Sequence, residues 1–197
     1  MKRIGLFGGS FDPPHRAHVA LAASALAQLA LAEVRWIPAG RPWQKTRTVT
    51  PAPHREAMVR IAIDGEPRFV LDRIELDRAG PSYTLDTVRA LQAREPGAEW
   101  VLLIGADQYA GLHTWEGWRE LLGRVTLAVA NRPGLHPAPH AEVLRHPHRV
   151  VPLAMLDISS TEVRARVARG EPIDDLVPSG VARYIDLHAL YREGKAR

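Results

Sequence analysis

Cysteine is absent from the sequence, which excludes disulfides and thiolate chemistry. A long hydrophobic run is missing as well, because the longest apolar stretch, Val19 to Val34, is interrupted by Ser24, Gln28 and Glu33. The first residues lead directly into a short apolar run that does not resemble the core of a signal peptide. We therefore expect a soluble, cytoplasmic protein that does not cross a membrane.

Charge of one sign is not concentrated anywhere in the chain. The formal net charge is +4 and the isoelectric point is near 9.8, but no run of lysine and arginine with interleaved aromatic residues appears. Small anionic substrates explain this charge as well as nucleic acid does, so no nucleic-acid partner is expected. The 197 residues are 46% hydrophobic, and no hinge-like segment divides them, which predicts a single domain over residues 1–197.

Segments with the periodicity of strands alternate with segments that have the periodicity of helices. Strands are expected at 4–7, 34–38, 69–71, 74–76, 100–104, 125–130 and 150–153. One helix is expected to follow the first strand and to extend to residue 29. Further helices are expected at 54–63, 84–93, 160–168 and 181–190, and two short helices are expected within 107–122. The segment 137–148, rich in proline and histidine, is expected to be mobile and on the surface. The alternation predicts an α/β fold, a Rossmann-like doubly wound parallel sheet with helices on both faces and a site at the carboxyl ends of its strands.

Residues 2–18 carry the first functional signal. An apolar strand ends there at two glycines, where the backbone can turn sharply and let a ligand approach. Pro14 or His15 is expected to begin a helix, and because no Ser, Thr, Asp or Asn precedes it, its first N–H groups would lack a side-chain cap and attract phosphate. His15 and His18 share one face of the first turn. Imidazole donors at this place suit transfer at phosphorus, where negative charge develops.

Two other interpretations of the histidine pair stay open at this point. A zinc site would use both rings, but no cysteine exists and no further histidine or acid follows at a suitable spacing. Two exposed histidines on an amphipathic helix are the simpler alternative. The loop itself, GLFGGS, is neither GxGxxG nor a P-loop, so the two commonest phosphate loops do not account for it.

The sequence GGSFDPPHRAH resembles the signature of the nucleotidyltransferases that transfer AMP or CMP from a nucleoside triphosphate, a superfamily that shares its (H/T)xGH motif with class I aminoacyl-tRNA synthetases. Ala17 stands where the pattern has glycine, and the helix should tolerate it because alanine is the best helix former. The resemblance implies that His15 and His18 are catalytic. It also implies a loop that binds ATP, formed by Gly8, Gly9, Ser10 and Phe11.

Residues 157–166, DISSTEVRAR, carry the second signal. Ser159 and Glu162 have the spacing of a capping box, and taken alone this means only that a helix begins here. The stretch also resembles the ISSTxxR signature with which the same superfamily grips the β- and γ-phosphates of ATP. The resemblance implies that Arg164 is catalytic and forks onto a phosphate, and that Ile158, Ser159 and Ser160 bind ATP.

The middle of the chain resembles one branch of this superfamily, the bacterial nicotinate-mononucleotide adenylyltransferases, and the resemblance covers essentially the whole sequence. The matching stretches are PSYT at 81–84, IGAD at 104–107, TWEGW at 114–118, NRPG at 131–134 and residues 177–191. The resemblance implies ATP contacts at Gly105, Asp107 and Arg132, although Arg132 fits equally well as a residue of the turn 131–134. In the loop 41–45 only Lys45, as a catalytic residue, carries over from the family pattern.

The same resemblance implies a site for the pyridine ring of the mononucleotide. Trp115 would stack on the ring, and the backbone near Thr84 and Glu116 would hold the carboxylate of the ring. Ser82 and Tyr83 would also contact the mononucleotide. Trp118, one helical turn after Trp115, is assigned to the core. Helices are expected to begin near Thr84 and near Trp115, so two helix N-termini with unpaired N–H groups would favour an anion beside the ring.

The implied reaction transfers AMP from ATP to nicotinate mononucleotide and yields nicotinate adenine dinucleotide and pyrophosphate, a step of NAD biosynthesis. The 5′-phosphate of the mononucleotide is already a nucleophile, so no side-chain nucleophile is needed. Lys45, Arg164 and Mg²⁺ would neutralise the departing pyrophosphate, and the Mg²⁺ would be carried by the ATP phosphates rather than by a protein metal site. ATP and nicotinate mononucleotide are the expected partners, and a homo-oligomer stays open.

Three alternatives belong beside this interpretation. Phosphopantetheine adenylyltransferase, or another small-molecule adenylyltransferase of the superfamily, would keep both phosphate motifs but gives no reason for the PSYT and TWEGW stretches. A non-catalytic nucleotide-binding sensor is a different class, and the retention of both motif histidines counts against it. A basic RNA-binding module is the third, and ATP-specific binding that persists at high salt would exclude it.

Overall fold

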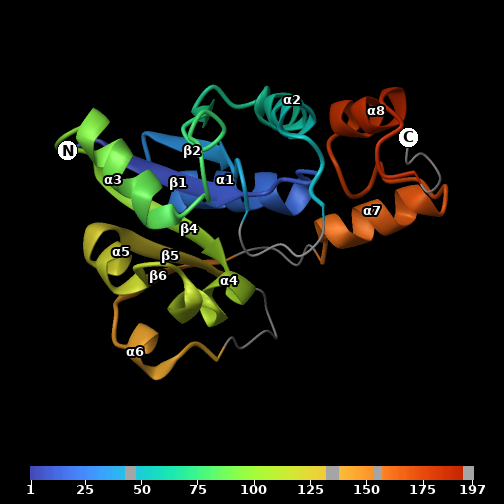
Figure 1. Ribbon diagram of the computed structural model, residues 1–197. Coiled ribbons are helices and arrows are strands. Elements are labelled where there is room, and N and C mark those ends of the chain that lie inside the picture. Colours follow the sequence, from blue (N-terminus) through green and yellow to red (C-terminus); the bar gives the residue numbers. More distant parts are fainter. Residues whose placement is uncertain (43–47, 132–137, 153–156, 193–197) are drawn as a thin grey trace.

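The computed structural model describes residues 1–42, 48–131, 138–152 and 157–192 (Figure 1). Within these ranges one sheet is formed by β1 (Arg3–Gly9), β2 (Glu33–Pro38), β3 (Phe69–Leu71), β4 (Glu99–Gly105), β5 (Thr126–Asn131) and β6 (His148–Pro152). The strands lie in the order β3-β2-β1-β4-β5-β6, and each pair of neighbours is parallel. The predicted doubly wound parallel sheet is therefore confirmed.

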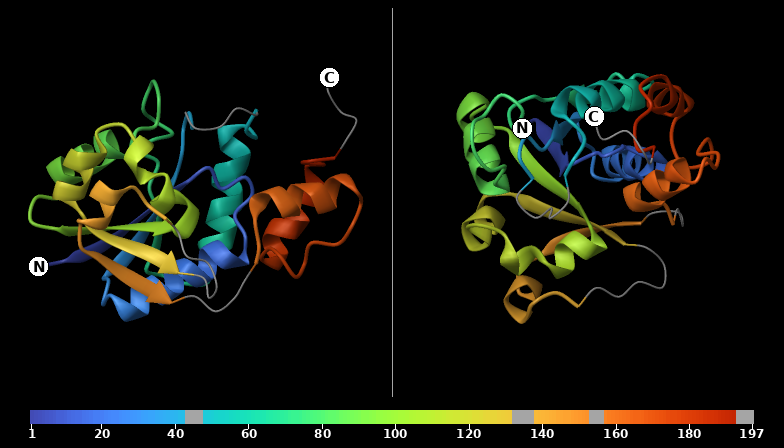
Figure 2. Two further views of the ribbon diagram at one scale, coloured as in Figure 1. Left: turned by 90° about the horizontal axis from the view of Figure 1, so that it is seen from below. Right: turned by 45° about the vertical axis from the view of Figure 1, so that its right-hand side comes forward.

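Helices cover both faces of the sheet (Figures 1 and 2). One face is covered by α1 (Arg16–Gln28) and α2 (Ala52–Ile63). The other is covered by α3 (Thr84–Arg94), α4 (Ala106–Ala110), the 3-10 helix η1 (Leu112–Thr114), α5 (Trp118–Arg124) and α6 (Ala141–Leu144). Two further helices, α7 (Ser160–Ala168) and α8 (Ser179–Leu187), lie beyond the carboxyl ends of the strands, beside α1 and α2. They close off one side of the edge at which a ligand site is expected.

The alternation of side chains along the strands divides the core into two layers. In β4, Trp100, Leu102 and Ile104 face the layer beneath α3 and α5, whereas Val101 and Leu103 face the layer beneath α1 and α2. Both sets are almost fully buried, as expected of a central parallel strand covered on both faces. A third cluster joins α7 and α8 to the helices α1 and α2.

Most elements lie where the sequence pattern predicts them, but three expectations are wrong. Residues 74–76 form a turn instead of a strand, because the Asp72 Oδ1 atom accepts the Ile74 N–H at 3.0 Å and bends the chain. The segment expected to be mobile holds α6, which buries Val143 in the core, and the start of β6. The last helix begins at Ser179 and ends at Leu187, earlier at both ends than predicted. In the described part of the chain, no helix combines the length and apolar character needed to span a bilayer.

Candidate active site

A cavity of about 680 Å³ lies at the carboxyl ends of β1 and β4. Every predicted site residue that the structure describes lines it: His15, His18 and Arg164; Gly8, Gly9, Ser10, Phe11, Gly105, Asp107, Ile158, Ser159 and Ser160; Ser82, Tyr83, Thr84, Trp115 and Glu116. The predicted residues Lys45 and Arg132 lie outside the described residues. Segments that are distant in the sequence thus meet at the edge of the sheet where parallel α/β folds bind ligands.

Two strand-end glycines leave space in the cavity wall. A Cβ atom added at Gly8 or at Gly105 would meet no other atom within 4 Å, so a side chain there would occupy room that is open to a ligand. At Gly9, an added Cβ atom would lie 3.2 Å from the ring of Phe11. Gly8 and Gly105 therefore suit close approach of a ligand to the backbone, while Gly9 makes room for a neighbouring ring.

The histidine pair is held by the start of α1. His15 is the N-cap residue, so the helix begins one residue after the predicted range. The start has no side-chain cap, as predicted, but the His15 backbone N–H donates to His18 Nδ1 at 3.1 Å. An Nδ1 atom that accepts a hydrogen bond places the proton of the neutral ring on Nε2. The arrangement therefore fixes His18 as an Nε2–H donor, and its ring stacks on that of His15 with centroids 3.6 Å apart.

Aromatic side chains support His18 from the core. Phe11 is 2% exposed, and its ring meets the His18 ring edge-on with centroids 5.2 Å apart. Phe7 and Trp36 pack against Phe11 in turn, with centroid distances of 5.4 Å and 5.2 Å. Phe11 was predicted to bind ATP and does line the cavity, but its contacts are those of a core residue that holds the imidazole in place.

The two phosphate motifs bind each other directly. Ser159 caps α7 as predicted, with its Oγ atom accepting the Glu162 N–H at 3.1 Å. The Ser160 hydroxyl donates to the Pro13 carbonyl at 2.8 Å, and Arg164 NH1 donates to the Asp12 carbonyl at 2.7 Å. The start of α7 is therefore fastened to the loop that leads into the histidines.

Asp12 is a support of this loop that the sequence analysis missed. Its side chain is fully buried, and its carboxylate accepts the Tyr191 hydroxyl at 2.7 Å and the Thr50 N–H at 3.3 Å. Burial, together with the Asp12 carboxylate, raises the pKa of the Tyr191 hydroxyl well above its usual value. The hydroxyl therefore stays protonated and can donate. No local pattern links residues so far apart in the chain, so the sequence offered no signal for this contact.

Arg55 is a second missed support, and here a signal existed. It is 2% exposed and donates from NH1 to the Ser10 carbonyl at 2.9 Å and from Nε to the Thr50 carbonyl at 2.8 Å. On α2 it precedes the buried Met58 and Val59 by three and four residues, so it lies on the apolar face of the helix. A charged residue on such a face must be paired inside the fold, which would have predicted a buried structural role.

At the other end of the cavity, Trp115 and Trp118 differ in burial as predicted. Trp118 is 8% exposed in the core, whereas Trp115 is half-buried, packs against the core layer and lines the cavity. The helix expected near Trp115 begins only at Trp118, and the Trp115 N–H already donates to the Leu112 carbonyl at 3.0 Å. The second helix N-terminus expected beside the ring is therefore displaced.

Gly117 permits the turn between Trp115 and α5. Its φ angle is +62°, and an added Cβ atom would lie 2.3 Å from a side-chain carbon of Leu85 in the first turn of α3. Both the left-handed backbone and the close packing require glycine. The turn that carries Trp115 and Glu116 is therefore pressed against the start of α3, with Glu116 exposed at the cavity.

The turn before α3 has a structural use for its serine. Ser82 is 9% exposed, and its Oγ atom accepts the backbone N–H groups of Gly40 and Arg41 at 3.0 Å and 3.1 Å. The helix α3 begins at Thr84 as predicted and has no side-chain cap. Its first N–H groups, which have no acceptor within the helix, are therefore the donors that this end of the cavity offers to an anion.

No cage of metal ligands is evident in the described ranges. Among those residues, no group of three or more His, Cys, Asp or Glu side chains is placed to hold a metal ion. Two carboxylates, those of Asp107 in the first turn of α4 and of Glu116, are exposed at the cavity wall. Oxygen atoms of this kind are ligands that suit Mg²⁺ when it arrives with phosphates.

Comparison with known proteins adds to this geometry. Residues 6–166 match the model of the Cytidylyltransferase-like family. The probable nicotinate-nucleotide adenylyltransferase of Methylibium petroleiphilum is 54% identical over 196 residues, which cover 96% of this chain and 92% of that relative. The protein of the same name from Bordetella petrii is 48% identical over 198 residues, which cover 98% of this chain and 100% of that relative. The likeness therefore extends over nearly the whole length of this chain and of each relative.

Solved structures share the fold. The structure of Plasmodium falciparum nicotinic acid mononucleotide adenylyltransferase complexed with NaAD superposes with a TM-score of 0.80 at 22% sequence identity, over 97% of this chain and 98% of that chain. A Vibrio parahaemolyticus structure described as a putative nicotinate-nucleotide adenylyltransferase gives a TM-score of 0.74 at 19% identity, over 98% of each chain. At these identities the likeness establishes the fold.

Proposed function

The chain belongs to the cytidylyltransferase-like family, and we propose that it transfers AMP from ATP to nicotinate mononucleotide, giving nicotinate adenine dinucleotide and pyrophosphate in NAD biosynthesis. One observation carries the proposal: a single cavity is lined both by the phosphate motifs and by the turn with Trp115. The relatives that match over nearly the whole chain have names that support the same reaction. In this reaction a phosphate oxygen of the mononucleotide attacks the α-phosphorus of ATP, and the bond to the pyrophosphate oxygen breaks.

At the phosphate end, we infer that the chain aligns the reactants and stabilises charge. His18, as an Nε2–H donor, would bind an oxygen of the α-phosphate while its charge increases, and the stacked His15 would assist. Arg164, held to the Asp12 carbonyl at the cavity wall, would face the β- and γ-phosphates together with Lys45. The open space at Gly8 and Gly105 supports a close approach of the nucleotide.

Mg²⁺ is assigned to the substrate in this proposal. The ion would enter on the phosphates of ATP and supply charge neutralisation on the departing pyrophosphate. The exposed carboxylate of Asp107 fits such an arrangement, because a substrate-borne ion needs few protein ligands.

At the other end, we infer that Trp115 stacks on the pyridine ring and that the start of α3 binds its carboxylate. The half-buried Trp115 is anchored in the core layer yet reaches the cavity. The uncapped first turn at Thr84 offers backbone donors and the positive end of a helix dipole. These groups favour an anion over a neutral amide.

The test is direct incubation of the purified chain with ATP, Mg²⁺ and nicotinate mononucleotide. We expect nicotinate adenine dinucleotide and pyrophosphate in equal amounts, with no dinucleotide when Mg²⁺ is chelated. Parallel incubation with phosphopantetheine checks the other adenylyltransferase. Turnover of phosphopantetheine alone, or ATP binding without any product, would overturn the proposal.

A further inference from the structure

A buried carboxylate, Glu75, has no role in the reaction described so far. It lies in the turn between β3 and α3, is 7% exposed and lines the cavity together with Ser82 and Thr84. Burial raises the pKa of the Glu75 carboxyl, against the opposing effect of its hydroxyl neighbours. Burying an ionisable acid destabilises the folded state unless hydrogen bonds compensate for the lost contact with water. The contacts of Glu75 are therefore expected to have a role in the site.

Both side-chain hydrogen-bond partners of Glu75 are hydroxyl groups. Thr87 Oγ1, fully buried in α3, lies 2.7 Å from Glu75 Oε1 and 3.2 Å from the Tyr83 carbonyl, and its single proton goes to the closer, carboxylate acceptor. Ser82 forms the second side-chain hydrogen bond to the carboxyl. Because Ser82 Oγ already accepts two backbone N–H groups, both of its lone pairs are used and its own proton goes to Glu75. Glu75 is therefore the acceptor for two donors that come from different segments.

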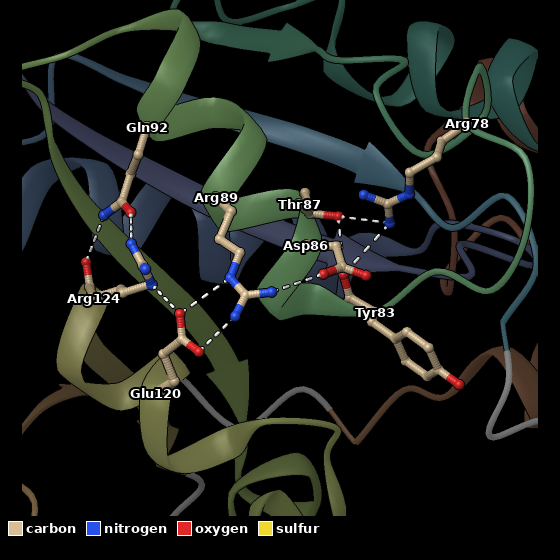
Figure 3. Close-up of polar contacts among 8 residues, drawn as sticks. All are labelled: Arg78, Tyr83, Asp86, Thr87, Arg89, Gln92, Glu120 and Arg124. Atoms are coloured by element: carbon tan, nitrogen blue, oxygen red, sulfur yellow. Dashed lines mark hydrogen bonds and ion pairs between the residues drawn. The ribbon is translucent and has the colours of Figure 1, made fainter.

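The same contacts extend to both flanking segments. Arg78 NH2 donates to Thr87 Oγ1 at 3.1 Å and to the Tyr83 carbonyl at 3.4 Å, as Figure 3 shows. At Gly40, an added Cβ atom would lie 2.1 Å from the Glu75 carbonyl oxygen, so the two backbones touch. The loop at 40–41, the turn at 74–76 and the start of α3 are thus joined around one carboxylate.

We propose that Glu75 is a positioning residue for the mononucleotide: by holding the hydroxyls of Ser82 and Thr87 it fixes the first turn of α3 where the carboxylate of the pyridine ring binds. The inference rests on the proposed function. Only a carboxylate supplies two acceptor oxygens and no donor, which matches two hydroxyls whose remaining sites are already occupied. Glutamine would turn one NH₂ donor toward a donor.

The negative charge of Glu75 should weaken binding of an anionic ring substituent, whereas the hydrogen bonds of Glu75 should strengthen it by fixing the turn. A negative charge in the cavity wall repels an anionic ring substituent, and the nearby Arg78 offsets part of this repulsion. Removing the charge alone would therefore improve binding of nicotinate mononucleotide, whereas loosening the turn would weaken it. The sign of the change in KM separates the two effects.

The experiment compares steady-state KM values for both substrates in the wild type, Thr87→Val, Thr87→Ser and Glu75→Gln. Thr87 does not line the cavity, so Thr87→Val alters only the support. We expect Thr87→Val and Glu75→Gln to raise KM for the mononucleotide by about 10- to 150-fold, as loss of a buried hydrogen bond to a charged group predicts, with KM for ATP nearly unchanged. Thr87→Ser restores the hydroxyl and should restore KM.

A matched pair elsewhere serves as the control. Thr126 Oγ1 donates to Glu99 Oε1 at 3.3 Å at the amino-terminal ends of β5 and β4, on the opposite edge of the sheet. Thr126→Val and Glu99→Gln remove the same kind of contact and should leave the ratio of the two KM values unchanged. Thermal unfolding of every variant reports the purely structural effect.

The outcomes are distinct. Equal changes in both KM values, or lower stability with an unchanged KM ratio, would overturn the inference and leave the cluster as support of the fold alone. A lower KM for the mononucleotide in Glu75→Gln would overturn it too, since charge would then dominate. Thr87→Val decides the question if Glu75→Gln does not fold. A wild type inactive with ATP and nicotinate mononucleotide would instead refute the proposed function.

Discussion

At the phosphate end of the cavity, most of the predicted contact residues come from two short stretches, 8–18 and 157–166, and these stretches also hold each other through Ser160 and Arg164. At the pyridine end, the predicted contacts lie in 82–84 and 115–116, but the groups that hold them, such as Glu75 and Thr87, lie elsewhere. The phosphate end thus carries part of its support within its own two motifs, in addition to that from Arg55 and Tyr191, whereas the pyridine end takes its support from other segments. Changes at the first end should act on kcat, and changes at the second on KM for one substrate.

The largest effect is expected for His18. His18→Ala removes the Nε2–H donor to the α-phosphate and should lower kcat by about 10²–10³, the range for loss of one donor to a developing oxyanion. The variant also loses the acceptor for the His15 N–H, so a modest fall in melting temperature is expected as well.

His18→Gln separates the two effects in this position. Glutamine at the third helical position can accept the N-cap N–H as in a capping box, but it has no imidazole. We therefore expect the melting temperature to return toward that of the wild type while kcat stays low. Wild-type kcat in either variant would show that the phosphate end does not act through His18.

Trp115 tests the pyridine end. Trp115→Ala should raise KM for the mononucleotide by about 5- to 150-fold, since stacking on a base contributes about 1–3 kcal/mol, and should change KM for ATP far less. Trp115→Phe retains an aromatic face and should lose less. Similar increases for both substrates would mean that Trp115 acts as a core residue, as Trp118 does.

The preference for nicotinate mononucleotide over its amide also tests the pyridine end. The uncapped start of α3 at Thr84 presents donors, so a pyridine carboxylate is stabilised there while an amide NH₂ would face other donors. We expect kcat/KM for nicotinate mononucleotide to exceed that for the nicotinamide form by roughly 10- to 100-fold. Steady-state rates at matched ATP measure the ratio. Parity would place an acceptor such as Glu116 at the ring.

The same contrast explains how much the sequence could predict. The phosphate end was readable because its signals are local: Ser159 and Glu162 lie three residues apart, and the glycines follow directly on an apolar strand. The capping of His15 by His18 was missed even there, because histidine is not among the preferred capping residues. Local patterns therefore gave the contact residues and the ends of most elements.

The support of the pyridine end was not predictable in this way. Ile74, Glu75 and Leu76 alternate like a strand, but the bond from the Ile74 N–H to Asp72 and the backbone bond from the Asp77 N–H to the Arg73 carbonyl turn them into the bend that places Glu75. The partners of that carboxylate lie in another helix and another loop. Long-range contacts of this kind leave no periodic trace, as the bond between Tyr191 and Asp12 also illustrates.

The smallest effect is expected on the exposed side of α3, where Arg89 faces away from Thr87 (Figure 3). Arg89 NH2 donates to Glu120 Oε2 at 2.6 Å, and Arg124 Nε donates to the same carboxylate at 2.7 Å, so the network joins α3 to α5. This network joins the two helices whose first residues lie at or next to the predicted pyridine contacts. Its side chains are 40–48% exposed, however, and water and salt screen such pairs.

Arg89→Ala should therefore change KM for the mononucleotide by less than about twofold, and raising the salt concentration should remove any difference in melting temperature from the wild type. Thr87→Val, on the same helix but fully buried, should show the opposite behaviour, with a KM effect that salt does not remove. Measuring both variants at low and high salt compares an exposed and a buried link on one helix. If Arg89→Ala raised KM as much as Thr87→Val, the position of α3 would depend on its contact with α5 rather than on the carboxylate beneath it.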